Sequence, residues 1–356
     1  MKKILIIYLF ATTILSAQNF TAKVDSIAKT HFKDSTMSGL AIGIVHNQKS
    51  ETFYFGGKYT NLSKDIDSLS LFEIGSITKV YTGFILESLE QDGILNKQDL
   101  IAKYLPQEIS KNKEWASKVR LIDLITHSSG MPSYDNTKSL SSFKNYNEED
   151  PFGIFNKEFI LSLLNKIDQI PDYGKIGYSN FGIGVLGIVL ENASGASFNE
   201  LLRRYLIDKM DLKNTYLELD EAHFTNFAIP HSGNEVRPII NLAAMKPAGS
   251  IKSSLPDLLT FVNFHMNPPD KYKSLVNNVL KSALKTDDAE VGLGWGIFEI
   301  DGVSLRGHNG GTYGSSSIVI IAPSQHLGVV VLSNNQNGNA TKYGISLIQE
   351  LIKENN

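Results

Sequence analysis

Apolar and polar positions alternate with two different periods along the chain, and these periods predict where strands and helices lie. Residues 39–45 and 51–55 are short runs rich in β-branched and aromatic residues, separated by a polar stretch, and such runs are typical of strands. Helical spacing of apolar residues precedes them over 21–32 and dominates the middle of the chain. Strand-like runs return near the end at 296–300, 303–307, 316–321 and 328–332, before a last helix over about 341–353.

This order of elements predicts an α/β fold of the α+β kind, built on one antiparallel sheet. Two strands at the start and several at the end most simply share that sheet, with the first and last helices on one face. The helical middle is then an insertion that forms a second lobe. We expect the sheet lobe to comprise about 18–72 and 245–356, and the helical lobe about 73–244. A cleft between two lobes is a favoured place for a small-molecule site.

The first 17 residues have the order of a secretory signal peptide. A basic start at residues 2–3 is followed by an apolar run over 4–15 and by small residues at 16–17. The run is too short to span a bilayer comfortably, which favours a cleaved signal over an anchoring helix. We therefore expect a secreted or periplasmic protein, with residues 18–356 as one catalytic domain and no stable membrane anchor after cleavage.

The composition of the chain argues against several classes of partner and of catalytic site. The formal net charge is −3, so no basic field indicates a nucleic-acid partner. The absence of cysteine excludes a disulfide framework, a thiolate nucleophile, a Cys-based zinc site and a lipid-modified cysteine. The eight histidines are scattered and no His-Glu-x-x-His motif occurs, so we expect no metal and no cofactor.

Ser76 and Lys79 form the first candidate for catalysis. Apolar residues recur after Ser76 at helical spacing, which puts Ser76 at a helix N-terminus and Lys79 one turn further on the same face. A serine hydroxyl becomes a good nucleophile when a neighbouring base takes its proton, and a buried lysine can be that base. The same Ser-x-x-Lys spacing also begins at four other serines, where an N-cap serine with a solvated lysine is the simpler interpretation: Ser26, Ser110, Ser141 and Ser282.

Two further motifs follow in the chain. Tyr178 and Asn180 precede the apolar stretch 181–190; the tyrosine could relay a proton and the asparagine amide could orient a substrate, although a turn tyrosine beside an N-cap asparagine is the simpler alternative. The sequence His308-Asn309-Gly310-Gly311 lies between two late strands, where glycines permit close approach of a substrate to a backbone edge. A plain Gly-rich hairpin is the alternative there, and His231 begins a competing His-x-Gly.

The three motifs in this order make the chain resemble class C β-lactamases and their relatives, the serine D,D-peptidases, D-aminopeptidases and β-lactamase-fold esterases. The resemblance covers essentially the whole mature chain and implies a β-lactamase/transpeptidase-like fold of two lobes. No Gly-x-Ser-x-Gly elbow is present, which argues against an α/β-hydrolase. The stretches that add to the resemblance are 71–79, 127–132, 246–251 and 292–296.

The resemblance also implies roles for single residues. Ser76 is then the acylated nucleophile, Lys79 the assisting base, Tyr178 a general base or acid, and Asn180 a contact to the substrate amide. The backbone N–H groups of Ser76 and Gly311 would form the oxyanion hole. The substrate would be a small molecule or a peptide, and no metal or cofactor is needed.

Two positions depart from the class C pattern. His308-Asn309-Gly310 stands where those enzymes carry Lys-Thr-Gly, and Tyr134 stands where they place a glutamine. An ordinary histidine titrates near ~6.5, so we expect His308 to lose most of its charge between pH 6 and 8 and its recognition of substrate carboxylates to weaken by about tenfold. The alternative is that His308 only caps the strand edge and does not meet the substrate. Three interpretations stay open: a hydrolase of β-lactams or D-amino-acid peptides, an esterase or other amidase, and a penicillin-binding protein that acylates without turnover.

Overall fold

The computed structural model describes residues 21–31, 39–58, 65–134 and 137–355. The signal peptide expected over residues 1–17 lies outside these described residues, and its cleavage stays a prediction.

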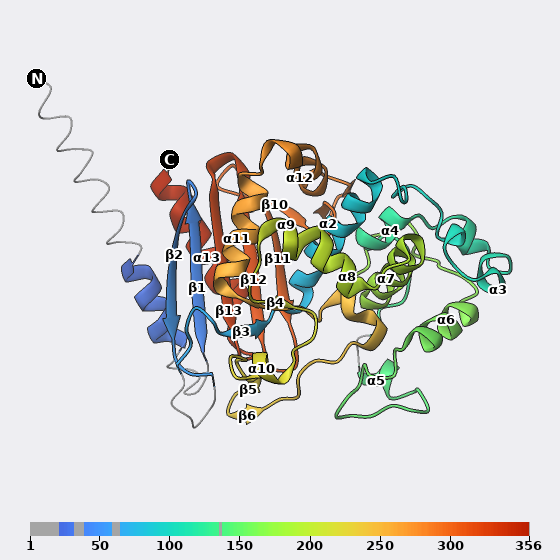
Figure 1. The fold of residues 1–356 in the computed structure, drawn as a ribbon, viewed down its shortest axis with the longest axis horizontal. Coiled ribbons are helices and arrows are strands. Elements are labelled where there is room, and N and C mark those ends of the chain that lie inside the picture. Colours follow the sequence, from blue (N-terminus) through green and yellow to red (C-terminus); the bar gives the residue numbers. More distant parts are fainter. Residues whose placement is uncertain (1–20, 32–38, 59–64, 135–136, 356) are drawn as a thin grey trace, which may run out of the picture.

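One antiparallel sheet of eight strands is the central element of the fold (Figure 1). Its strand order is β2-β1-β13-β12-β11-β10-β9-β8, so the first strands of the chain lie beside the last. Leu40 of β1 stands opposite Ser333 of β13, which confirms the expectation that the two ends of the chain share a sheet. The strands are β1 (Leu40–His46), β2 (Lys49–Phe55), β8 (Leu284–Lys285), β9 (Glu290–Val291), β10 (Gly296–Ile300), β11 (Val303–Gly311), β12 (Ser316–Ala322) and β13 (Leu327–Ser333).

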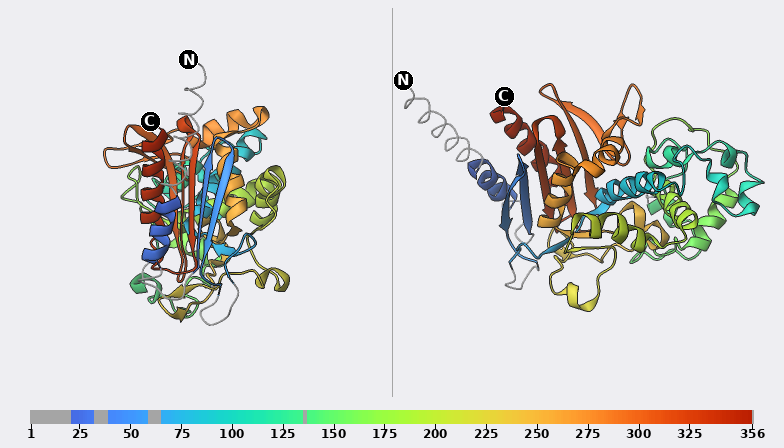
Figure 2. Two further views of the ribbon diagram at one scale, coloured as in Figure 1. Left: turned by 90° about the vertical axis from the view of Figure 1, so that its left-hand side faces the viewer. Right: turned by 45° about the horizontal axis from the view of Figure 1, so that its top comes forward.

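Both faces of the sheet are covered by helices, as Figure 2 shows. Along β13, Val329 and Val331 join one apolar cluster, while Val330 and Leu332 join the other. This alternation is the period of two that a strand imposes on its side chains. The helix over 21–31 and α13 (Ala340–Asn355) pack on the first face, as the sequence predicts, and α11 (Leu255–Met266) packs on the second.

The sequence placed the end of β11 wrongly. It predicted a strand that stops at 307 and left a Gly-rich hairpin open as the alternative for residues 308–311, whereas β11 runs through Gly311. The strand continues because Gly310 pairs with Ser317 and Gly311 with Ser316 of β12. Residues 308–311, which the sequence placed between two strands, are therefore themselves strand residues and pair with β12.

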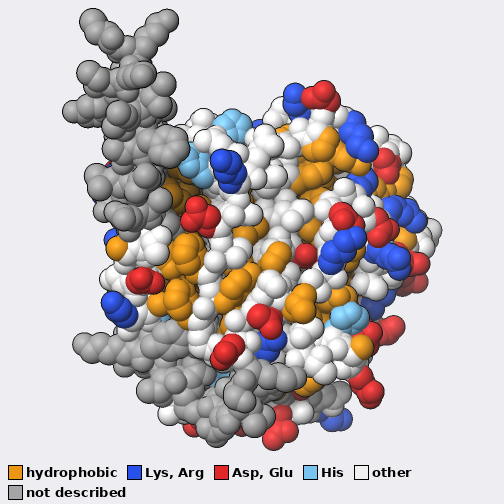
Figure 3. Space-filling model, turned by 60° about the vertical axis from the view of Figure 1, so that its left-hand side comes forward, with side chains coloured by type: hydrophobic (Ala, Val, Ile, Leu, Met, Phe, Trp, Pro, Cys, Tyr) orange, Lys and Arg blue, Asp and Glu red, His pale blue; other side chains and the backbone are white. Residues whose placement is uncertain are grey.

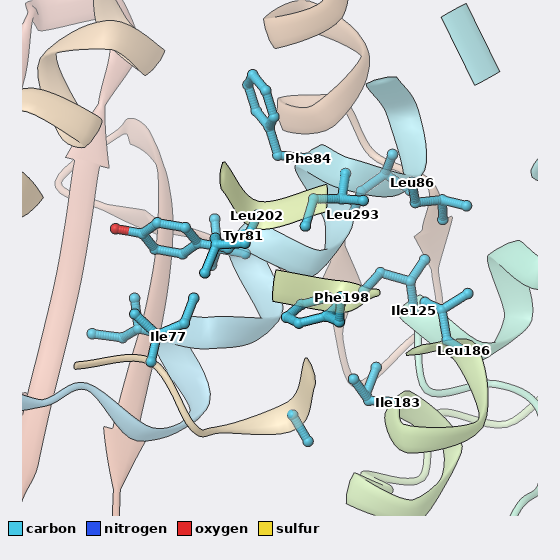
Figure 4. Close-up of a cluster of buried hydrophobic side chains, with 14 of the residues drawn as sticks. Ile77, Tyr81, Phe84, Leu86, Ile125, Ile183, Leu186, Phe198, Leu202 and Leu293 are labelled. Carbon is cyan, nitrogen blue, oxygen red and sulfur yellow. The ribbon is translucent and has the colours of Figure 1, made fainter. Parts of the chain in front are cut away.

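Most of the remaining helices come between β3 (Leu71–Glu73) and β7 (Lys252–Ser254) in the chain. Strand β7 pairs with β3 on one side and with β4 (Thr215–Tyr216) on the other, in a small sheet. The helix α2 (Thr78–Gln91) is buried over twelve of its residues and contacts the other helices through apolar side chains (Figure 4). A helix covered on every side is a core helix. The others are α3 (Gln107–Ser110), α4 (Leu121–Ile125), α5 (Thr137–Leu140), α6 (Lys157–Lys166), α7 (Asn180–Ser194), α8 (Phe198–Leu202), α9 (Asp208–Met210), α10 (Glu221–Phe224) and α12 (Lys273–Leu280).

Within the described ranges, no single helix has both the length and the apolarity needed to cross a membrane. Helix α7 reaches that length only when joined to the following segment Phe198–Met210, from which it is bent by 82°. On the face of the molecule drawn in Figure 3, apolar side chains form small groups separated by polar and charged ones. Such scattered apolar groups are normal on a protein surface.

Candidate active site

Ser76 lies in a tight turn between β3 and α2. The turn is a single 3-10 turn over Gly75–Ile77, and α2 follows from Thr78, so Ser76 precedes the α-helix by two residues. Gly75 has a φ of +52°, a left-handed conformation that favours glycine. The backbone N–H of Ile74 donates to the carbonyl of Ile251 at 3.1 Å, which anchors the start of the turn to the segment before β7.

Lys79 is fully buried and its ammonium group is surrounded by oxygen acceptors. Its Nζ donates to Ser76 Oγ at 3.0 Å, to Asn180 Oδ1 at 2.8 Å and to the carbonyl of Ala248 at 2.7 Å. An ammonium group has three N–H donors, and these three contacts use them. A charged ammonium group has donors and no acceptor, so the oxygen Oδ1 of Asn180 faces Lys79. The amide nitrogen Nδ2 of Asn180 is therefore turned away from Lys79.

Tyr178 completes the contacts of Ser76 from the helical lobe. Its hydroxyl lies 2.6 Å from Ser76 Oγ, its ring lies under Lys79 Nζ at 4.7 Å, and its side chain is 44% exposed. Lys79 and Tyr178 thus both contact Ser76 Oγ, and either hydroxyl can be the donor in the bond between Ser76 and Tyr178. The three residues therefore form a chain of hydrogen bonds, which the sequence expected from their order alone.

The position of Tyr178 is set by the cap of α7 and by His127. Ser179 is the N-cap of α7, accepts from Gly182 N at 2.8 Å and donates to the carbonyl of Pro132 at 2.6 Å. Its own N–H donates to His127 Nδ1 at 3.2 Å, and the His127 ring lies 4.5 Å from the Tyr178 ring. Because Nδ1 accepts this bond, the proton of neutral His127 is on Nε2.

Strand β11 passes directly against the turn that holds Ser76. A Cβ at Gly310 would collide with the carbonyl oxygen of Ile74, and a Cβ at Gly75 would come within 2.7 Å of Gly311 N. Ser317 Oγ on β12 donates to the same Ile74 carbonyl at 2.8 Å. Glycines at 75 and 310 thus allow two backbones to touch, and the result is that Gly311 lies next to the nucleophile turn.

His308 and Asn309 lie further back along β11. His308 Nδ1 lies 2.6 Å from the carbonyl of Asn309, and since a carbonyl only accepts, this nitrogen carries the proton. Removal from water, and then the positive charge of Lys79, lower the pKa of His308 to about 4. The same two causes, with His308 itself, lower the pKa of His127 to about 3. The expectation that His308 titrates near ~6.5 is therefore wrong: burial beside Lys79 keeps it neutral above pH 5.

The structure separates the alternatives that the sequence left open. Tyr134 stands apart from the hydrogen-bonded group: its ring packs on Phe143, Phe155 and Phe181 at centroid distances of 5.6, 6.1 and 5.0 Å. Among the described contacts none joins Tyr134 to Ser76.

The competing His231 lies buried in the two-residue strand β5 (His231–Ser232), where its backbone N–H donates to the carbonyls of Gly314 and Asn334.

Glu73, which lies on β3 three residues before Ser76, is a buried residue of the site that no motif in the sequence indicated. Its buried carboxylate accepts from Ile240 N at 2.7 Å and from Thr312 Oγ1 at 2.5 Å, and Thr312 directly follows Gly311. Burial raises the pKa of Glu73, and the hydrogen bonds and Lys252, opposite it on β7, act in the other direction. The available signal was a single carboxylate inside an apolar strand.

A cavity of about 250 Å³ opens beside Tyr178 and His308. Ile125, Ile176 and Trp295 supply apolar walls, and His127 and Asn309 are also in its lining. Elsewhere, the described ranges hold no group of three or more His, Asp or Glu side chains placed to bind a metal ion.

A family model named Beta-lactamase matches residues 22–350. The chain belongs to the Beta-lactamase family. The geometry around Ser76 is therefore that of a member of this family of serine hydrolases, which act on small molecules.

Individual relatives of this Beta-lactamase family member are distant. Protein flp of Staphylococcus aureus is 25% identical over 322 residues, covering 88% of this chain and 62% of that protein. The chain thus spans less than two thirds of that relative's length. A β-lactamase of Yersinia enterocolitica is 22% identical over 380 residues, covering 94% of this chain and 92% of that one.

A crystal structure of a class C β-lactamase from Rhodobacter sphaeroides superposes with a TM-score of 0.79 at 20% identity, covering 93% of this chain and 99% of that one. At this identity the likeness confirms the fold, an antiparallel sheet with helices and an inserted helical lobe.

Proposed function

We propose that the chain hydrolyses an ester or amide bond through an acyl-enzyme on Ser76. The observation that carries the proposal is the pair of contacts to Ser76 Oγ, from Lys79 Nζ at 3.0 Å and from Tyr178 at 2.6 Å. A serine with two proton-transfer groups in hydrogen-bond reach is an activated nucleophile.

The proton follows the chain of hydrogen bonds. Tyr178 acts as the phenolate, which the neighbouring Lys79 ammonium stabilises, and it takes the proton of Ser76 as Ser76 Oγ bonds to the substrate carbonyl carbon. The carbonyl oxygen becomes an oxyanion held by the backbone N–H groups of Ser76 and Gly311. The bond to the leaving group then breaks, and Tyr178 returns the proton to the leaving oxygen or nitrogen. Water hydrolyses the acyl-enzyme by the reverse route and releases a carboxylic acid.

The remaining residues have binding roles in this proposal. Asn180 is oriented by Lys79, so its Nδ2 donates to an acyl-side carbonyl of the substrate. His308, Asn309 and Gly310 form the strand edge beside the reacting bond. Tyr134, whose ring packs on Phe181 at the start of α7, stays a proposed substrate contact. Secretion to the periplasm or medium is proposed from residues 1–17 only.

Two substrate classes fit this machinery. The names of the Yersinia and Rhodobacter relatives support β-lactams, and the resemblance adds D-amino-acid peptides. Those two together are the first class; the second class is esters or simple amides, and a specific observation favours it. His308 is neutral where the class C pattern has a lysine, so a substrate carboxylate finds no charged partner at that position.

Covalent labelling tests the proposal. A fluorophosphonate or a fluorescent penicillin is expected to add one acyl or phosphonyl group, which peptide mass spectrometry maps to Ser76, and Ser76→Ala should abolish both label and turnover. Ser282→Ala is the matched control, since Ser282 begins the same Ser-x-x-Lys spacing on an exposed segment. Unchanged labelling of Ser76→Ala would remove the proposed function.

A further inference from the structure

The cavity beside Tyr178 lies on the leaving-group side of the reacting bond. Tyr178 is the group placed to protonate the leaving atom, and a proton donor must contact the atom that it protonates. The cavity is lined by that same tyrosine, and by His308 on the opposing strand. A leaving group that receives its proton from Tyr178 therefore enters this cavity. This step rests on the proposed function.

The walls of the cavity are apolar or neutral. Ile125, Ile176, Val291 and Trp295 contribute apolar surface, and the rest is glycine backbone with Asn309, Tyr178 and two histidines. Both histidines are neutral near pH 7, because their pKa values are lowered to about 3 and about 4. Of the described residues that line the cavity, none is Lys, Arg, Asp or Glu.

Two cations close to Ser76 and His308 already donate to protein acceptors. Lys79 donates to Ser76, Asn180 and Ala248, so its three N–H groups are used before a substrate arrives. Arg306, two residues before His308 on β11, donates Nε to the carbonyl of Leu280 at 2.8 Å and Nη1 to Ser304 Oγ at 2.7 Å. Arg306 is not part of the described lining. A carboxylate in the cavity would lose its water without gaining a charged partner.

The volume sets the size of the occupant. At ~30 Å³ for each water in the liquid, about 250 Å³ equals the space of roughly eight waters, enough for a phenyl ring or a short branched alkyl group.

We infer that this cavity binds the leaving group and selects a neutral, apolar one. The preferred substrates are esters or amides whose departing alcohol or amine is an aryl or branched alkyl compound without a carboxylate. In the step concerned, the bond from Ser76 Oγ to the acyl carbon forms, the bond to the departing oxygen or nitrogen breaks, and the serine proton leaves with the departing group.

A matched pair of esters tests this selectivity. Phenyl acetate and 3-carboxyphenyl acetate share the acyl group, so they give the same acyl-enzyme and differ only in acylation, which kcat/KM reports. Each rate constant is divided by the rate of hydroxide-catalysed hydrolysis to correct for the different leaving groups. We expect the neutral ester to be favoured by about tenfold or more, because the carboxylate loses its water in the cavity without gaining a charged partner.

Two variants sharpen the test. His308→Lys places a cation at the cavity and should reduce the preference for phenyl acetate severalfold or reverse it. Ile176→Trp fills the cavity and should lower kcat/KM for phenyl acetate while sparing methyl acetate, whose leaving group is small. Lys175→Ala is the matched control for the second variant, because Lys175 is the exposed neighbour of Ile176 and pairs with Asp172.

The outcomes separate this inference from the proposed function. Equal corrected rates for the two esters, or a faster carboxylate ester, with turnover still abolished in Ser76→Ala, would overturn the selectivity and leave the acyl-enzyme intact. Turnover that survives in Ser76→Ala would overturn the proposed function, whatever the preference between the esters.

Discussion

The carboxylate of Glu73 accepts a hydrogen bond from Thr312 Oγ1 at 2.5 Å, although 239 positions separate the two residues. Glu73 ends the strand that leads into the nucleophile turn, and Thr312 follows the last residue of β11. The bond therefore joins the segment that carries Ser76 to the segment that carries Gly311. The two N–H groups of the proposed oxyanion hole come from these two segments, so their spacing depends on this contact.

Thr312→Val should lower kcat by about tenfold or more and leave KM nearly unchanged, because a misplaced oxyanion donor weakens the transition state more than the bound substrate. Thr312→Ser keeps the hydroxyl and should restore kcat. Steady-state kinetics on an ester, with thermal unfolding to verify the fold, measure both. If valine and serine at 312 gave the same kcat, the contact would have no part in positioning the site.

Tyr178→Phe should slow acylation by about 10²–10⁴-fold, the usual contribution of a general acid–base group, while the protein stays folded. Tyr178 is 44% exposed and its hydroxyl contacts Ser76, so loss of this hydroxyl costs little stability. Stopped-flow acylation by a chromogenic ester gives the rate directly. Tyr173→Phe is the matched control, since Tyr173 lies in the same loop and its hydroxyl bonds to Asp123 at 3.0 Å instead. A normal acylation rate in Tyr178→Phe would assign the proton transfer to Lys79.

The preference between the two esters should be independent of pH from 6 to 8. His308 and His127 have pKa values lowered to about 4 and about 3, by loss of hydration first and by Lys79 second, so both are neutral throughout this interval. The ratio of the two kcat/KM values, measured at several pH values, tests this. In His308→Lys the ratio should move toward the carboxylate ester and still be flat. A ratio that changes severalfold around pH 6.5 would mean that His308 titrates like a solvated histidine.

His265 on α11 should make the fold sensitive to acid. Burial lowers its pKa to about 4, and its Nδ1 donates to the carbonyl of Phe261 at 2.9 Å. Above pH 6.5 the side chain is neutral both folded and unfolded. Between pH 6.5 and 4 only the unfolded chain takes up the proton, so the free energy of unfolding falls as the pH falls, by at most about 3 kcal/mol.

His265→Phe removes this proton uptake and keeps an aromatic ring among Phe84, Phe261 and Trp295. Urea unfolding at pH 7 and pH 4.5 should therefore show a smaller loss of stability for the variant than for the natural chain. His46→Phe is the control at an exposed position on β1. An equal loss in His265→Phe and the natural chain would contradict the assignment.

Local patterns were sufficient to predict much of the fold. Strands β1, β10, β12 and β13 and helix α7 lie within a few residues of the ranges that periodicity gave, because each has one buried face or is buried throughout. Strands β8 and β9 were missed, since two residues are too few to show a period. The end of β11 was wrong because a glycine run is typical of turns, and only the pairing with β12 makes it a strand here.

The site was predicted in part, for a related reason. Ser76, Lys79, Tyr178 and Asn180 came from motif order, and the structure brings all four into one network. Two further groups of the site, Glu73 and the carbonyl of Ala248, contact Thr312 and Lys79 across long stretches of the chain. No local sequence pattern contains such contacts. The ordinary pKa expected for His308 failed because its environment is made by Lys79 and by burial, both of which are tertiary.

The pairing of β1 with β13 has a consequence for how the protein is made. Gly39 N donates to Asn334 Oδ1 across 295 positions, and β1 has β13 as its neighbour over its whole length. During synthesis β1 leaves the ribosome early and must wait, with only β2 beside it, until the last strand emerges. Closing so long a loop is slow, so the sheet forms after translation rather than during it. In that interval the edge of β1 is open, and a chaperone that covers extended apolar segments should bind there first.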